Sequence, residues 1–284
     1  MRYLKSLFIF FFLITSFCFA DDVTERLGEG VVNWSEGYIE VLGNGAPPLD
    51  VNNKAQARLM AERAALVVAY RNLVEAVNGV RVNSESTINN YVVESDKIKT
   101  GIEGFVQGAA IIPNEKTGEN YTYLSDGSIR VKLRVPINGN DSLAEFVMPE
   151  VMESEGVDEP KKMKKVRKLK PGAVTGIVFD ASEFDLKPAM SPHVYDENGK
   201  EVYGTQFVTR RFAIEKGVAG YVKGVDNIES DTRTGDNPLV IQAIEVDGSV
   251  ATDIIISSKD AKKIKKLKNK DNLFSECKIN IVLK

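Results

Sequence analysis

Histidine and cysteine, the residue types that most catalytic and metal sites need, are scarce in this chain. The 284 residues contain one histidine, His193, and two cysteines, Cys18 and Cys277. A structural zinc site takes four ligands, mostly histidine and cysteine, and no Gly-x-Ser-x-Gly elbow is present to supply a nucleophile for His193. We interpret His193, which follows Pro192, as a structural residue and expect no catalytic residue, no metal site and no cofactor.

Two groups of acidic residues could also carry chemistry. One could offer oxygen ligands to calcium and falls in an irregular segment: Asp226, Glu229, Asp231 and Asp236. Its spacing lacks the Asp-x-Asp-x-Asp-Gly pattern of a calcium loop, which favours a solvated loop. The other could support cleavage of glycan strands and follows an expected strand: Asp180, Glu183 and Asp185. Acidic residues are common at strand ends, so this group does not by itself indicate glycan cleavage. We predict that the protein is not an enzyme.

Neither glycine-rich segment near the start of the chain matches a phosphate-binding loop. Gly28-Glu29-Gly30 and Gly43-Asn44-Gly45 lack the spacing of both the dinucleotide loop and the P-loop. We therefore do not expect nucleotide binding.

Residues 1–20 have the pattern of a cleaved secretory signal peptide. Two basic residues precede an apolar run at residues 7–14, and the segment ends in Cys18-Phe19-Ala20. The apolar run is too short to span a bilayer. We expect cleavage near Ala20 and a mature protein that is periplasmic or associated with the outer membrane. Acylation at Cys18 is the alternative, which we favour less because the bulky Phe17 directly precedes this cysteine.

The rest of the chain has the composition of a folded globular protein and the length of two domains. Hydrophobic residues make up 43% of the sequence and charged residues 27%, as is typical of globular chains. The formal net charge of −3 is too small to identify a partner. After signal cleavage Cys277 would be the only thiol, and because it alternates with Ile279 and Ile281 we expect it to be buried.

We predict a first α+β domain at residues 31–152. Its segment 31–42 has the composition of a strand, and residues 53–77 lack proline and glycine and repeat apolar residues at helical spacing. The many alanines would let this helix lie close against a sheet, and Gly79 is placed to cap the helix in the left-handed conformation. A second, weaker helix is predicted at residues 86–103.

A hairpin is predicted around Asp126-Gly127, which is the chemistry of a two-residue turn. In that register Leu124 faces Ile129 on the buried side of the sheet. The other side would carry aromatic and basic residues, which dominate the energetics of protein interfaces. We take these residues as the candidate contact face: Tyr121, Tyr123, Arg130, Lys132 and Arg134.

A charged linker is predicted at residues 153–171, followed by a second α+β domain at residues 172–284. The linker is acidic in its first half and basic in its second, and charge blocks of this kind stay solvated. Hairpins are expected at Asn198-Gly199 and Asp247-Gly248. We expect both domains to pair their strands in mainly antiparallel sheets.

An amphipathic helix is predicted at residues 258–270, with Ile264 and Leu267 facing inward. Four of its outward lysines form a candidate patch for an anionic ligand: Lys262, Lys263, Lys265 and Lys266. An exported protein meets lipopolysaccharide, peptidoglycan, anionic lipid or acidic proteins, and we expect no nucleic-acid partner. The plainer interpretation, which we prefer, is a solvated helix face.

An alanine- and arginine-rich pattern runs through the first domain. It comprises residues 55–65 (AQARLMAERAA), 70–73 (YRNL), 77–80 (VNGV), 104–109 (GFVQGA) and 131–136 (VKLRVP). On these residues the first domain resembles a bacterial envelope lipoprotein domain that also occurs in the flagellar proteins FlgP and FlgT. The second domain, with residues 186–192 (LKPAMSP) and 201–204 (EVYG), is similar to a companion segment of uncharacterised bacterial relatives.

The resemblance implies a non-enzymatic, exported protein, often associated with the outer membrane. Some members of the family build rings or disks around the flagellar motor. We therefore expect a structural or assembly role through protein contacts, with envelope or flagellar proteins or a second copy of the chain as partners. The alternative is an envelope binding module for an anionic ligand such as lipopolysaccharide or peptidoglycan.

Overall fold

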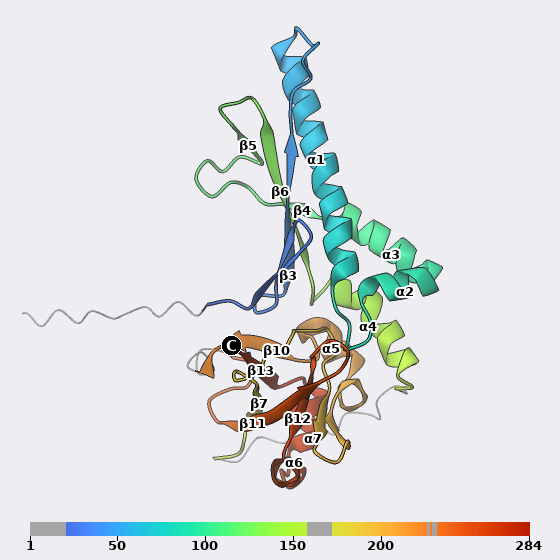
Figure 1. The fold of residues 1–284 in the computed structure, drawn as a ribbon, viewed down its shortest axis with the longest axis vertical. Helices are drawn as coiled ribbons and strands as arrows, with labels where there is room; N and C mark the ends of the chain where they lie inside the picture. The colour runs from blue at the N-terminus through green and yellow to red at the C-terminus, as the bar shows by residue number, and fades with distance from the viewer. Residues whose placement is uncertain (1–20, 158–171, 226–227, 229–231) are drawn as a thin grey trace, which may run out of the picture.

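The computed structural model describes residues 21–157, 172–225, 228 and 232–284. In these residues two β-sheets and seven α-helices form the α+β fold that the sequence predicts (Figure 1). The first sheet and its helices (residues 21–157) are called the first unit below, and the rest (172–284) the second unit. The predicted signal peptide and most of the predicted linker lie outside the described residues. No helix in the described ranges combines the length and apolar character that a bilayer crossing requires.

The first sheet is antiparallel throughout. Its strands run in the order β1 (Thr24–Leu27), β2 (Gly30–Asn33), β3 (Tyr38–Gly45), β6 (Ile129–Pro136) and β4 (Ala110–Ile111), and β5 (Tyr121–Tyr123) also pairs with β6. The β1–β2 hairpin belongs to this sheet, so the first unit starts before the predicted boundary at residue 31.

Helix α1 (Lys54–Gly79) lies along β3 at the very short distance that small residues permit (Figure 1). The Asn53 side chain caps the helix by accepting from two backbone N–H groups of its first turn. A Cβ atom at Gly43 would lie 2.1 Å from the carbonyl oxygen of Ala65, and one at Gly45 would lie 2.1 Å from that of Ala61. The predicted close packing is therefore confirmed.

The other helices of the first unit depart from their predictions. Gly79 lies inside α1 and does not take the predicted left-handed conformation. The single helix predicted at residues 86–103 is two helices, α2 (Ile88–Glu94) and α3 (Asp96–Gln107), because Ser95 adopts extended backbone and caps α3. Helix α4 (Leu143–Ser154) was not predicted, and it extends into the segment predicted as linker.

The second sheet corrects the expectation of mainly antiparallel pairing. Its order is β10 (Gly220–Lys223), β13 (Ile279–Leu283), β7 (Gly176–Asp180), β11 (Pro238–Asp247), β12 (Asp253–Ile256), β8 (Val194–Asp196) and β9 (Glu201–Tyr203). Four of the six pairs are parallel, and only the β11–β12 and β8–β9 hairpins are antiparallel. Every residue of β7 and β13 is buried, as in strands covered on both faces. Hairpin signals report only neighbours along the chain, whereas these parallel pairs join remote segments.

Short helices connect the strands of the second unit. They are η1 (Thr205–Phe207), α5 (Arg210–Lys216), α6 (Ser258–Lys265) and α7 (Lys270–Ser275). The helix predicted at residues 258–270 therefore stops at Lys265, and a separate helix follows. Cys277, directly before β13, is fully buried as predicted, and its φ of 52° is left-handed.

The three predicted hairpins form, but none has a two-residue turn. The loop between Leu124 and Ser128 has three residues and ends in Gly127, whose φ is 85°. This is the three-residue turn with a glycine bulge, which is the alternative to the two-residue turn. Gly199 ends a similar loop at φ 74°, and β11 and β12 are joined by residues 248–252. As a result, Ile129 lies opposite Tyr123 instead of the expected Leu124.

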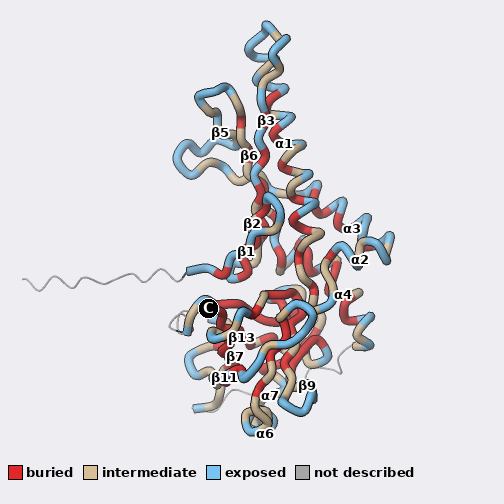
Figure 2. Tube along the Cα trace, in the orientation of Figure 1, coloured by how far each residue is buried: buried red, intermediate tan, exposed pale blue. Residues whose placement is uncertain are grey.

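The two units share one hydrophobic core (Figure 2). The rings of Trp34 and Tyr221 meet edge-on with centroids 5.8 Å apart, and the Ser35 hydroxyl donates to the Tyr221 carbonyl over 2.9 Å. Arg81 binds Glu25 of the first unit and donates to the carbonyl of Pro188 in the second. Polar and apolar contacts thus join the units directly.

Candidate contact surfaces

The candidate contact face divides between the two sides of the first sheet. Tyr121 and Tyr123 pair with Val131 and Ile129, whose side chains are buried on the side of α1. The alternate residues of β6 point to the opposite side and are only partly buried: Arg130, Lys132 and Arg134. The prediction of one shared face is therefore wrong, because a one-residue change of register moves every side chain of a strand to the other face.

Tyr123 attaches the β5–β6 hairpin to α1. Its hydroxyl donates to Glu62 over 3.0 Å and accepts from Arg58 over 2.6 Å. The Arg58 guanidinium also lies 4.4 Å from the centre of the tyrosine ring, within the range of a cation–π contact. These contacts give Tyr123 a structural role within the molecule.

The basic residues of β6 form cross-strand pairs with β3. Arg134 contacts Glu40 at 2.8 Å and lies 3.9 Å from the centre of the Tyr38 ring. Lys132 reaches the same carboxylate at 3.7 Å, and Arg130 donates to Asn44 over 2.9 Å.

We call this side of the sheet the outer face. It consists of Tyr38, Glu40, Leu42, Asn44, Arg130, Lys132 and Arg134. Leu42 at its centre is 40% exposed, and a hollow of about 410 Å³ beside it extends to the loop after β4. The outer face therefore presents ordered charged side chains and one apolar residue on a rigid sheet.

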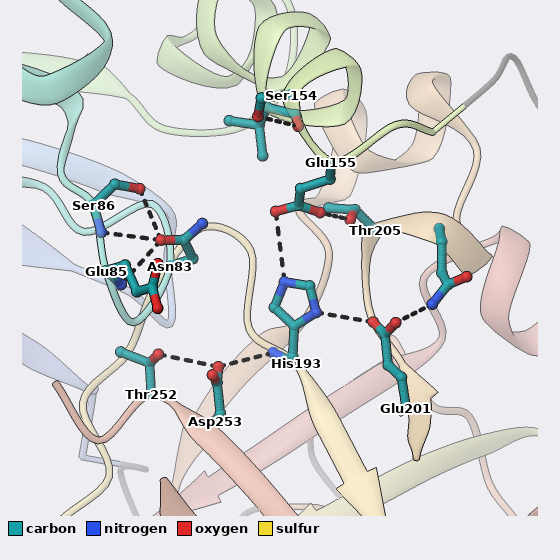
Figure 3. Close-up of polar contacts among 12 residues, drawn as sticks. Asn83, Glu85, Ser86, Ser154, Glu155, His193, Glu201, Thr205, Thr252 and Asp253 are labelled. Carbon is teal, nitrogen blue, oxygen red and sulfur yellow. Dashed lines mark hydrogen bonds and ion pairs between the residues drawn. The ribbon is translucent and has the colours of Figure 1, made fainter. Parts of the chain in front are cut away.

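A polar cluster around His193 joins the two units (Figure 3). The Nδ1 atom of His193 lies 2.9 Å from Glu201 of β9, and Nε2 lies 3.5 Å from Glu155, which follows α4. Thr205 donates to Glu155, and Gln206 donates to Glu201. The backbone N–H of His193 donates to Asp253 over 3.3 Å.

The cluster holds a proton on the imidazole. Burial by itself would lower the pKa of His193, but the hydrogen bonds and negative charges of Glu155 and Glu201 outweigh burial and raise this pKa to about 10. An imidazole that stays protonated at neutral pH suits an ion pair better than a general base. Sequence reasoning missed this cluster because residues 155, 193 and 201 come from separate elements, and the single histidine was the only signal.

The four lysines of the candidate anionic patch are all exposed on or next to α6, but they point in two directions. Lys262 and Lys265 line a hollow of about 350 Å³ between α6 and β9, which Lys263 and Lys266 do not line. Lys263 instead forms an ion pair with Asp260 at 2.6 Å. The hollow also includes Lys200 and Lys270, which the sequence did not connect with the patch.

Two members of the acidic groups have structural partners. Asp180 is buried and accepts from the backbone of Ser182 over 3.0 Å, and Asp185 pairs with Lys187 at 2.8 Å. Asp226, Glu229 and Asp231 of the possible calcium loop lie outside the described residues.

Comparison with known proteins finds a similarity in the second unit. The family model of the second domain of Treponema pallidum Tp0624 matches residues 176–284. This range begins at the first residue of β7 and includes every strand of the second sheet. No curated protein matches the chain. The second unit is therefore similar to the second domain of Treponema pallidum Tp0624, in agreement with the companion segment expected from the sequence.

Proposed function

We propose that this protein is an exported, non-enzymatic component of the bacterial cell envelope that acts through protein contacts. The observation that supports a contact role most is the outer face of the first sheet. Its arginines are held by Glu40 and Asn44 across the β3–β6 pair, so a partner would meet side chains that are already ordered. The pattern at residues 1–20 supports export, to the periplasm or the outer membrane.

The resemblance of the first unit to the FlgP and FlgT domain supports a role in the flagellar motor and self-association. Under this proposal the partners are envelope or flagellar proteins, or a second copy of the chain. Arginine and tyrosine side chains such as Arg134 and Tyr38 are common at the energetic centres of interfaces.

Charge reversal on the outer face tests the contact role. The variant Arg130→Glu/Lys132→Glu should lose in-cell crosslinks to its partner and any oligomeric mass of the purified protein. The control Arg63→Glu/Arg71→Glu makes the same charge change on the exposed side of α1 and should keep both. Equal crosslinking by both variants would argue against the outer face.

The alternative is an envelope binding module for an anionic ligand such as lipopolysaccharide or peptidoglycan. The exposed lysines of α6 support it, since three of the four have no ion-pair partner among the described residues. Salt-sensitive binding to envelope fractions, lost when Lys262, Lys263, Lys265 and Lys266 are neutralised, would favour this function over the contact role.

A further inference from the structure

The hollow beside α6, which we call the α6 hollow, combines an apolar wall with a basic rim. Val202, Phe207 and Ala261 supply partly exposed apolar surface, and the rim carries four lysines: Lys200, Lys262, Lys265 and Lys270. We propose that the α6 hollow binds a small amphipathic anion, a carboxylate with a single short aliphatic chain. The proposal rests on the alternative function above and names its ligand class.

The lysines of the basic rim are available to a ligand. Lys200, Lys262 and Lys265 form no ion pair with any residue that the structure describes, and Lys270 approaches Asp271 only to 3.9 Å. At Lys200, Lys262 and Lys265 a ligand carboxylate would therefore gain charge-assisted hydrogen bonds without displacing an existing ion pair.

The two acidic residues that also line the hollow have other partners. Asp196 accepts from the backbone N–H groups of Asn198 and Lys200, each over 3.0 Å. Glu201 binds His193 and Gln206. These contacts engage both acidic side chains within the protein.

Contacts within the protein hold the apolar wall in place. Phe207 packs edge-on against Phe274 with ring centroids 5.6 Å apart, and Ile264 is 1% exposed. The volume of about 350 Å³ is near the lower end of the range for small-molecule sites, which favours one short chain over a lipid with several.

The test measures binding of octanoate to the mature protein by calorimetry, with acetate and 1-octanol as comparison ligands. Acetate lacks the chain and 1-octanol lacks the charge, so both should bind at least about tenfold more weakly, a difference of 1.4 kcal/mol. Equal binding of acetate and octanoate would show that the apolar wall takes no part and would overturn the proposal.

Matched variants locate the site. Lys262→Ala/Lys265→Ala should weaken octanoate binding at least about tenfold, while Lys263→Ala/Lys266→Ala removes the same charge from the same region and should change it less than about twofold. Ala261→Phe keeps every lysine but fills the hollow and should abolish binding, with circular dichroism to confirm the fold. Equal loss in both double variants would overturn the proposal.

The failures of the two proposals can be told apart. If lipopolysaccharide binds in a lysine-dependent way but octanoate does not, the anionic-ligand function stands and the α6 hollow is not its site. If neither lipopolysaccharide nor octanoate binds, both the anionic-ligand function and the proposed site in the α6 hollow are wrong. The contact role of the outer face is in the first unit and is tested separately by the Arg130→Glu/Lys132→Glu variant.

Discussion

The imidazole of His193 and the carboxylate of Glu155 join the two units, with Nε2 of the histidine 3.5 Å from the carboxylate oxygen. Glu155 follows the last helix of the first unit, whereas His193 precedes β8 of the second. On its other nitrogen the ring meets Glu201 at 2.9 Å. One protonated side chain thus neutralises carboxylates from both units.

The stability of the protein should decrease at alkaline pH because of this cluster. The pKa of His193 is raised in the folded state from 6.5 to about 10. Its contribution is therefore complete below pH 6.5 and is lost as the pH rises from 6.5 to about 10, since the folded state binds more protons in this window. Urea unfolding should show the stability of the natural protein approaching that of His193→Gln over this range. Parallel stability curves for the two proteins would contradict the assignment.

Removing the histidine should cost stability at neutral pH. His193→Ala leaves Glu155 and Glu201 without the cation between them, and we expect a loss of roughly 1.5–3 kcal/mol, the value of hydrogen bonds to charged groups. The double variant His193→Ala/Glu155→Gln should recover part of this loss because it removes one of the two like charges. Thermal or urea unfolding at pH 7 measures both, and no recovery in the double variant would count against the cluster.

The close contact between β3 and α1 should not tolerate a methyl group. In Gly43→Ala the new Cβ would lie 2.1 Å from a backbone oxygen, and relief requires the helix to move, which we expect to cost about 1–3 kcal/mol or more. Gly104→Ala is the matched control. Gly104 lies in α3, and apart from its chain neighbours and the backbone of its own helix nothing lies within 4 Å of the place that its new methyl group would take. This variant should therefore gain about 0.5–1 kcal/mol. Similar unfolding free energies for the two variants would show that the contact is loose.

The tyrosine that attaches the β5–β6 hairpin should matter for local order more than for global stability. Tyr123→Phe keeps the ring but loses the hydroxyl bonds to Glu62 and Arg58. Because the group is exposed, we expect a loss of less than about 1 kcal/mol. Hydrogen exchange of residues 121–123 should become faster, while exchange in α1 stays unchanged. Unaltered exchange in the hairpin would mean that these bonds do not hold it.

The thiol of Cys277 should be unreactive in the folded protein. The side chain is fully buried, and burial raises the pKa of the thiol to about 12, so almost no thiolate exists at pH 8. A thiol reagent should modify the mature protein only after urea unfolding. Rapid labelling without denaturant would show that the segment before β13 opens.

Local patterns were sufficient for several elements of this fold. Apolar residues at helical spacing with many alanines predicted α1, because both signals lie within one segment. The apolar surroundings of Cys277 predicted its burial. The predicted hairpins exist, but Asp-Gly and Asn-Gly fit both two-residue turns and three-residue loops with a glycine bulge, and sequence offered no means to choose. That choice decided the side of the sheet on which Tyr123 lies.

By itself, then, the sequence determined an α+β fold, its long helix and the scarcity of residues for site chemistry, since all of these depend on composition and short-range spacing. Only the tertiary structure decided which strands pair in parallel, which carboxylates surround His193 and which lysines of α6 share a hollow with Lys200. The reason is physical: these arrangements arise from packing between segments that are distant in the chain, and local propensity carries no information about such neighbours.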